Sequence, residues 1–225
     1  MLIVEKQLKE TELENVLLKK EVETIKAIKE ERERIGDDLH DDLGSRLSAI
    51  RLELEYLQNL FEDKDVQQKM TGVVVQSREL SSIIREVVWS LNAQYDTLDS
   101  FAIFVKEYVY NLLSVTKIDL QMHIDEDIPN KEMSNAIRRA LFLTIKETLN
   151  NALKHSEASL IVFKLNLNSD NRLEISIEDN GHGMDGENQF GNGLRSMQKR
   201  IESIGGEFLI SNKEGGVEIS FSVCL

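Results

Sequence analysis

A carboxylate and two glycines follow an apolar segment at Asp179-Asn180-Gly181-His182-Gly183. The apolar residues before it alternate and lead directly into the carboxylate: Leu173, Ile175 and Ile177. Asp179 therefore ends a core-facing series, where a carboxylate is costly to bury unless a hydrogen-bond donor satisfies it. An exocyclic amine such as that of adenine would be such a donor. The two glycines would let the backbone turn sharply and approach a ligand closely.

A second glycine loop, Gly191-Asn192-Gly193-Leu194, opens a predicted helix that runs to Ile204. A helix that begins at such a loop presents free backbone N–H groups, which bind phosphate. The loop follows Asp179 closely, across a polar, Gly-rich segment that we expect to form a short mobile lid.

Glu147, Asn151 and Lys154 share one face of a further predicted helix, because they are spaced by four and three residues. A carboxylate, an amide oxygen and a cation on one face suit Mg²⁺ and phosphate groups. Taken singly, each of the three motifs also has a plainer interpretation: a turn with an exposed aspartate, a weak glycine pair and a solvated polar helix face.

The first 60 residues contain no proline and are typical of a long helix with a heptad seam. The seam residues step by four and three: Val4, Leu8, Thr11, Asn15, Leu18, Val22 and Ile25. Asn15 falls at an a position, where asparagine favours paired, in-register helices at some cost in stability. We therefore expect a parallel dimeric coiled coil. Continuing this register through a polar interruption places His40 at an e position, beside the seam and open to solvent.

A second helix is predicted from about Asp65 to Leu91, after a short polar break at residues 61–65. Two long helices joined by a short loop form an antiparallel hairpin, and two hairpins from a dimer form a four-helix bundle. The fold class of this half is therefore all-α, and residues 92–100 are expected to be a linker.

The rest of the chain alternates between helical and strand patterns. Helices are predicted at residues 101–114 and 132–154, and strands at residues 160–167, 173–177, 208–210 and 217–223. Apolar residues lie on one face of each strand, so one sheet face is wet and helices cover the other. This pattern predicts an α/β two-layer sandwich.

Composition limits the classes of partner. The 225 residues carry 27 Lys plus Arg against 40 Asp plus Glu, which gives a formal net charge of −13. Because nucleic acid and anionic membranes need a cationic face, we expect no nucleic-acid partner. The single cysteine, Cys224, excludes an intrachain disulfide framework and a multi-cysteine zinc site. The low cysteine content indicates a reducing, cytosolic setting, so we expect a cytoplasmic chain. No membrane-spanning segment is predicted, and the chain could also be the cytosolic part of a membrane receptor.

Taken in order, the three motifs resemble the N box, the DxGxG box and the later GxGL box of the Bergerat-type ATPase domain that histidine kinases share with gyrase-type and chaperone ATPases. The resemblance implies that ATP and Mg²⁺ are bound, with Asn151 coordinating the metal and Asp179 binding the adenine amine. It also implies that Gly181 and Gly183 form a hinge beside the base. Gly191, Gly193 and Leu194 would form the phosphate-side end of the lid, and Glu147 would lie near the metal and the γ-phosphate.

A fourth motif indicates the branch of this family. The segment from Glu31 to Gly44, which contains His40-Asp41, resembles the phosphoacceptor segment of the sensor histidine kinases represented by nitrate sensors and membrane-fluidity sensors. Trp89-Ser90-Leu91-Asn92 resembles the end of their second helix. The resemblance implies that the neutral imidazole of His40 attacks the γ-phosphate of ATP, while Asp41 fixes its tautomer and takes the proton as general base.

The resemblance further implies a homodimeric protein histidine kinase that passes its phosphoryl group to an aspartate of a response-regulator receiver domain, typically one with a LuxR-type DNA-binding output. Three parts are expected: a coiled-coil signalling helix at 1–30, a dimerisation and phosphoacceptor hairpin at 31–94, and a catalytic ATP-binding domain at 100–225.

Two residues depart from the family pattern. Ser45 stands where the family often has a glutamine linked to dephosphorylation of the partner, which puts phosphatase activity in doubt, and Ala93 replaces an expected proline. Two alternatives also stay open. One is a Bergerat-type serine kinase of the anti-sigma type, although that branch lacks a long phosphoacceptor hairpin. The other is a non-catalytic, ATP-binding dimeric scaffold.

Overall fold

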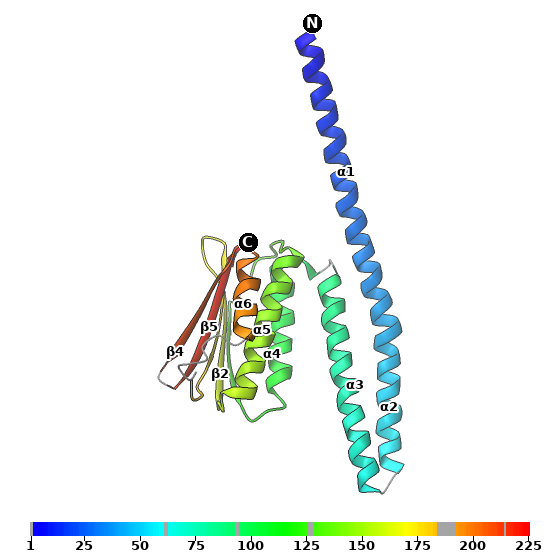
Figure 1. The fold of residues 1–225 in the computed structure, drawn as a ribbon, viewed down its shortest axis with the longest axis vertical. Helices are drawn as coiled ribbons and strands as arrows, with labels where there is room; N and C mark the ends of the chain where they lie inside the picture. The colour runs from blue at the N-terminus through cyan, green and yellow to red at the C-terminus, as the bar shows by residue number, and fades with distance from the viewer. Residues whose placement is uncertain (1, 61–62, 93–94, 126–127, 184–191, 214) are drawn as a thin grey trace. The chain divides into compact units, whose positions relative to one another are not determined.

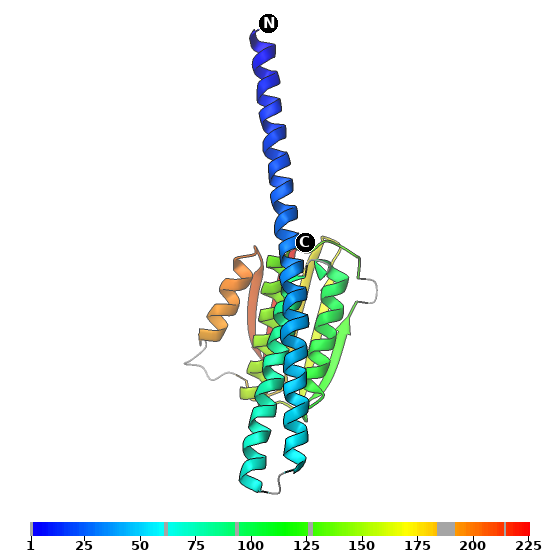
Figure 2. The same ribbon diagram turned by 90° about the vertical axis from the view of Figure 1, so that its right-hand side faces the viewer.

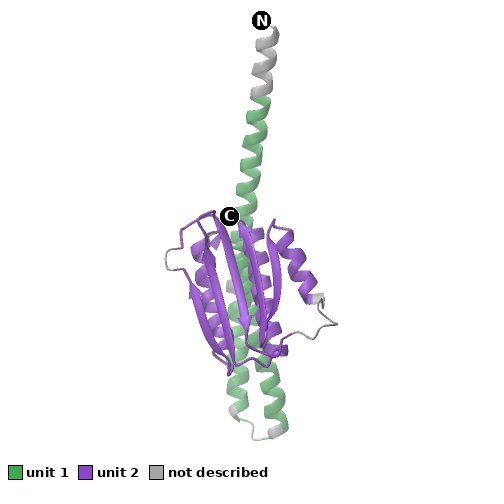
Figure 3. Ribbon diagram, turned by 90° about the vertical axis from the view of Figure 1, so that its left-hand side faces the viewer, with its two compact units in different colours: residues 1–93 green, residues 94–225 purple. Residues whose placement is uncertain are grey.

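The computed structural model of the chain describes residues 2–60, 63–92, 95–125, 128–183, 192–213 and 215–225 (Figure 1). Within these ranges the side chains of residues 2–11, 40, 41, 59, 64, 85 and 192 are not described. The chain forms two compact units, residues 1–93 and 94–225 (Figure 3).

Long helices make up unit 1. They are α1 (Leu2–Asp38), the π-helix η1 (Leu39–Gly44), α2 (Ser45–Leu60) and α3 (Lys64–Leu91). α1 continues through residues 30 and 31 without a break, so the boundary between coiled coil and hairpin stays a prediction.

α3 returns antiparallel along α2 (Figure 2). Gln58 Nε2 donates to Thr71 Oγ1 at 2.7 Å, and Arg78 Nη2 donates to Glu55 Oε1 at 2.8 Å. The sequence separation between these partners grows with distance from the loop, as an antiparallel pair requires. The predicted helical hairpin is therefore confirmed.

The end of α1 packs on the end of α3. A Cβ built on Gly36, which is buried, would lie 3.8 Å from the carbonyl oxygen of Val88 and 3.9 Å from Leu91 Cβ. Arg32 Nη2 donates to the carbonyl oxygen of Ser90 at 3.4 Å. The hairpin thus extends beyond α2 and includes the last two turns of α1.

The helix changes type at the segment that contains His40. Leu39–Gly44 form a π-helix, in which hydrogen bonds join residues i and i+5 instead of i and i+4. An α-helical heptad register does not continue in phase through such a segment, so the e position that continuing the register gave His40 does not carry over to the structure. The side chains of His40 and Asp41 lie outside the described residues, and the roles predicted for them stay predictions.

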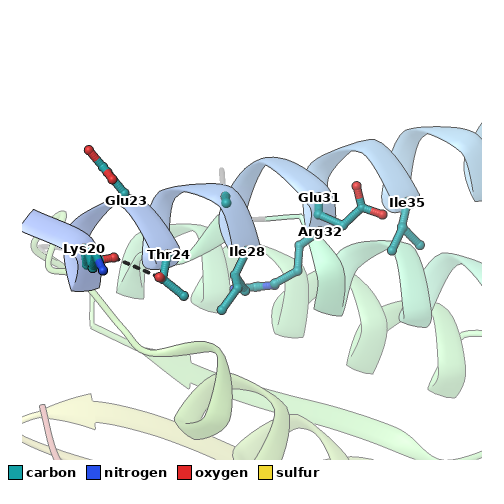
Figure 4. A pocket seen from close by; sticks show the side chains of 8 residues that line it. Lys20, Glu23, Thr24, Ile28, Glu31, Arg32 and Ile35 are labelled. Atoms are coloured by element: carbon teal, nitrogen blue, oxygen red, sulfur yellow. Dashed lines mark hydrogen bonds between the residues drawn. The ribbon is translucent and has the colours of Figure 1, made fainter.

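α1 presents apolar side chains to solvent. Leu18, Val22 and Ile25, which belong to the predicted seam, are 53%, 65% and 60% exposed. A shallow hollow along the same helix is lined by Ile28 and Ile35 together with polar and charged side chains (Figure 4). The exposed apolar row of Leu18, Val22 and Ile25 is what a paired helix would bury.

Helices and strands alternate in unit 2. The helices are α4 (Leu98–Leu113), α5 (Asn135–His155) and α6 (Asn192–Glu202), and the strands are β1 (Asp119–Ile124), β2 (Leu160–Leu167), β3 (Arg172–Asp179), β4 (Glu207–Lys213) and β5 (Gly216–Cys224). The described strands form a five-stranded sheet in the order β1-β2-β3-β5-β4. β1 and β2 are parallel, and the other neighbours are antiparallel.

α4, α5 and α6 cover one face of this sheet, and Figure 3 shows the opposite face. The core lies between the two layers. Its β2 and β3 residues are at most 2% exposed: Ile161, Phe163, Leu165, Leu173, Ile175 and Ile177. The odd-numbered alternation read from the sequence is therefore the buried face, and the predicted two-layer α/β sandwich is confirmed.

The sequence prediction omits β1, which forms an edge of the sheet. Leu120 and Met122 are only half-buried there, and they alternate with exposed Asp119 and Gln121. Because an edge strand buries so little, its apolar pattern is short and weak.

The residues before α4 are tied to the loop before α5. The Arg138 side chain is fully buried, and its Nη2 lies 2.9 Å from Asp96 Oδ1. Met133 N donates to the carbonyl oxygen of Asp96 at 2.9 Å, and Leu98 N donates to that of Lys131 at 2.8 Å. The second half of the predicted linker, 92–100, is therefore part of unit 2.

Candidate functional site

A cavity of about 360 Å³ lies among α5, the end of β3, β5 and the start of α6. Six of the predicted site residues line it: Glu147, Asn151, Asp179, Gly183, Gly193 and Leu194. The volume is within the usual range of small-molecule sites. Residues from all three sequence motifs of the second domain therefore converge on one concave surface.

Asp179 is half-buried at the last position of β3. Gly181 N donates to its Oδ1 at 3.0 Å, and the backbone N–H of Val217 on β5 also donates to this carboxylate. Burial raises the pKa of Asp179 above its ordinary value of 3.8 and outweighs the opposing effect of the two N–H groups. A further donor from a ligand would therefore stabilise the charged form of this carboxylate.

The turn after Asp179 rests directly on the residue that follows α5. A Cβ at Gly181 would lie only 2.1 Å from the carbonyl oxygen of Ser156, and His182 N donates to that oxygen at 3.1 Å. Gly183 has a φ of +82°, a conformation that favours glycine. Both glycines are thus required by this turn, in agreement with the close approach that the sequence indicated.

The polar face of α5 meets the first turn of α6. A Cβ at Gly193 would lie 2.8 Å from Glu147 Oε1 and 4.0 Å from Asn151 Nδ2. The start of α6 leaves backbone N–H groups without helical partners, and these point toward the N-terminal side of the helix. A carboxylate, an amide and free N–H groups therefore gather at this end of the cavity.

Other predicted residues lie elsewhere. Lys154 is exposed and does not line the cavity, and its role stays a prediction. Gly191 lies outside the described residues. His40 and Asp41 belong to unit 1, and their side chains are likewise not described.

Several lining residues were missed by sequence reasoning: Thr148, Ala152, Ser156, Ile177, Val217 and Ile219. Val217 is placed by strand pairing, because it stands opposite Asp179 in the β3–β5 register. The alternation of β5 assigned Val217 and Ile219 to the face covered by helices, but only the register shows that Val217 meets the carboxylate.

Comparison with known proteins agrees with this arrangement. Residues 31–96 match the family described as "Histidine kinase", and residues 136–225 match the family described as "Histidine kinase-, DNA gyrase B-, and HSP90-like ATPase". Both matches occur in one chain and in this order. The chain belongs to the sensor histidine kinases.

Curated relatives of this histidine kinase include UhpB, a signal transduction histidine-protein kinase/phosphatase of Salmonella typhimurium (30% identity over 190 residues, 82% of this chain and 37% of the relative). The sensor histidine kinase DesK of Bacillus subtilis is 30% identical over 190 residues, which cover 83% of this chain and 49% of the relative. The NarQ homologue of Haemophilus influenzae is 25% identical over 210 residues, which cover 86% and 35%. The chain thus spans about a third to a half of the length of these relatives.

The fold of this histidine kinase is also found among solved structures. The histidine kinase domain of the blue-light activated histidine kinase EL346 from Erythrobacter litoralis has a TM-score of 0.50 at 15% identity, and the match covers 80% of this chain and 94% of that one. The ATPase domain implies ATP binding. Among the described helices of this kinase, none has the length and apolar character needed to cross a membrane.

Proposed function

We propose that this chain transfers the γ-phosphoryl group of ATP to His40 and then to an aspartate of a separate response-regulator receiver domain. The observation that carries the proposal is the convergence of Glu147, Asn151, Asp179 and Gly193 on one cavity, together with the family of both regions of the chain.

The Asp179 end of the cavity is the proposed site of the adenine base. Its carboxylate is half-buried and accepts from the N–H groups of Gly181 and Val217, and the exocyclic amine of adenine would add a donor. Ile177 and Ile219 supply apolar wall beside it, which suits the faces of a purine ring. Gly183 lines the same cavity and adds no side chain to it.

The start of α6 is the proposed site of the phosphates. Backbone N–H groups at a helix N-terminus bind anions. Within the part of the chain that the structure describes, no cluster of three or more Asp, Glu, His or Cys side chains could hold a metal ion alone. Glu147 and Asn151 offer hard oxygen atoms near Gly193, which suits Mg²⁺ that is also bound by phosphates. When bound, Mg²⁺ would offset phosphate charge.

His40 is the proposed phosphoacceptor. Its neutral imidazole nitrogen forms a bond to the γ-phosphorus, the bond from that phosphorus to the β–γ bridging oxygen breaks, and ADP leaves. Asp41 holds the other ring nitrogen by a hydrogen bond and takes its proton. The phosphohistidine then gives its phosphoryl group to a receiver aspartate. A LuxR-type DNA-binding output is the proposed class of that partner.

A homodimer is the proposed working form. Histidine kinases of this family dimerise through the hairpin, and Leu18, Val22 and Ile25 on α1 expose a row that a second copy would bury. Pairing through this row would extend the dimer interface along the coiled coil.

The test is incubation of the chain with γ-labelled ATP and Mg²⁺. We expect acid-labile, base-stable label that is lost in His40→Gln and kept in His123→Gln. His123 is a suitable control because it is on the exposed side of edge strand β1 and does not line the cavity. Label that survives His40→Gln would refute the phosphoacceptor assignment. Acid-stable label would favour a serine kinase, and ATP binding without label would favour the scaffold.

A further inference from the structure

The side chain of Asn180 joins two strands beside the cavity. Its Oδ1 accepts from Ser159 N at 2.9 Å and from Leu160 N at 2.8 Å, and its Nδ2 donates to Ser159 Oγ at 3.0 Å. The backbone adds a fourth bond, from Asn180 N to the carbonyl oxygen of Leu160 at 3.2 Å. The turn after β3 is thus bound to the start of β2 through one residue.

Asn180 stands in the chain between Asp179, which lines the cavity, and Gly181, which donates to the Asp179 carboxylate. Gly181 in turn rests on Ser156, the residue that follows α5. Any rotation of the turn would therefore move both the carboxylate and one of its two N–H donors. The carboxamide of Asn180 is placed to prevent that rotation.

Solvent exposure separates this effect from general stability. Asn180 and Ser159 are both exposed, so water can replace the lost hydrogen bonds when the carboxamide is removed. The free energy of unfolding should then change little. The direction of the Asp179 carboxylate should change more, since the three side-chain bonds that hold the turn to the start of β2 are then lost.

We propose that Asn180 is a positioning residue for base recognition, which keeps the Asp179 carboxylate directed at the exocyclic amine of the bound base. The proposal rests on the proposed function, in which Asp179 accepts that amine. Asn180 itself needs no contact with the nucleotide.

The experiment compares the affinity of the full chain for ATP with its affinity for purine riboside triphosphate, which lacks the exocyclic amine. Wild type should bind ATP about tenfold or more tightly than the analogue, because a hydrogen bond to a charged group is lost. In Asn180→Ala the ratio should fall to about threefold or less. Asn180→Asp keeps an acceptor for the two N–H groups and should retain most of the ratio.

Ser159→Ala is the matched control, since it removes only the bond to Asn180 Nδ2 and should leave the ratio unchanged. If Asn180→Ala weakens the binding of both nucleotides equally and keeps the affinity ratio, Asn180 only supports the fold and the proposal is overturned. If Asn180→Ala does not fold, Asn180→Ser, which also removes the carboxamide and its three bonds, is measured in its place and judged by the same criterion. A wild-type ratio near one, together with tight ATP binding, would show that Asp179 does not contact the exocyclic amine. That result would overturn this proposal and leave the proposed kinase activity standing.

Discussion

Glu147 and Gly193 are in direct contact across two helices: a Cβ on Gly193 would lie 2.8 Å from Glu147 Oε1. The two residues come from motifs that are far apart in the sequence. Their contact joins the polar face of α5 to the first turn of α6, and it fixes where the carboxylate can lie relative to the free N–H groups of that turn.

Gly193→Ala should therefore slow labelling of the proposed acceptor, His40, by about tenfold or more, because a displacement of about 1 Å in the proposed phosphate site is costly. The Glu147 side chain can move aside, so the midpoint of thermal unfolding should change little. Gly72→Ala is the matched control, since nothing lies within 4 Å of its Cβ and Gly72 is in the interior of α3. Equal labelling rates in Gly193→Ala and wild type would contradict the contact.

Asp179→Asn should abolish the preference for ATP over purine riboside triphosphate. The same substitution should stabilise the nucleotide-free protein. The pKa of Asp179 is raised in the folded state by burial, so protonation favours folding. This stability is present below pH 3.8, the ordinary pKa, and is lost as the pH rises through the folded-state pKa. Asparagine has no charge to desolvate.

The thermal midpoint of Asp179→Asn should exceed that of wild type by about 1–3 °C at neutral pH, and the difference should vanish near pH 3.8. Circular dichroism melts over this range would measure it. Asp170→Asn, an exposed turn residue, should show no such trend. A lower midpoint for Asp179→Asn at neutral pH would show that the N–H groups of Gly181 and Val217 outweigh burial.

Asp96→Asn should lower the free energy of unfolding by about 1–3 kcal/mol, because it removes the charge that faces fully buried Arg138 at 2.9 Å. Urea unfolding would measure the change. Glu207→Gln breaks the ion pair with Arg172, but Glu207 is 72% exposed, and about 0.5 kcal/mol or less is expected. Similar losses in the two variants would mean that burial does not strengthen the Asp96 pair.

Lys213→Met should destabilise unit 2 at low salt and much less at high salt. Glu178 and Glu218 stand opposite each other on β3 and β5, and Lys213 Nζ lies 3.0 Å from a carboxylate oxygen of each. Without the cation, two like charges face each other across the strands. Thermal midpoints at two salt concentrations test this, with Lys164→Met as a lysine control on the same sheet. A salt-independent loss would indicate lost packing instead.

Periodicity predicted most of the fold because burial follows it closely. Ile175 and Ile177, which were assigned to the inner face of a strand from alternation alone, are at most 2% exposed. β1 was not predicted because its apolar residues, such as Leu120, are only half-buried at the sheet edge. Where few side chains are buried, the sequence carries little pattern to read.

The sequence predicted those site residues that belong to short, local motifs. Glu147, Asp179 and Gly193 each belong to a short motif, whereas Val217 reaches the Asp179 carboxylate only through strand pairing. Ser156 likewise supports Gly181 through tertiary contact. Such residues have no local signal, since their role depends on the register between distant segments.

The π-helix at Leu39–Gly44 has a practical consequence for engineered fusion proteins. A π turn holds about one residue more than an α turn, so η1 behaves as an α-helix with an insertion. The helical phase of residues upstream of Leu39 therefore differs from the phase of residues downstream of Gly44. A foreign input helix fused to α1 should be matched in phase to residues before Asp38, and a spacer counted back from α2 would be one residue out of step.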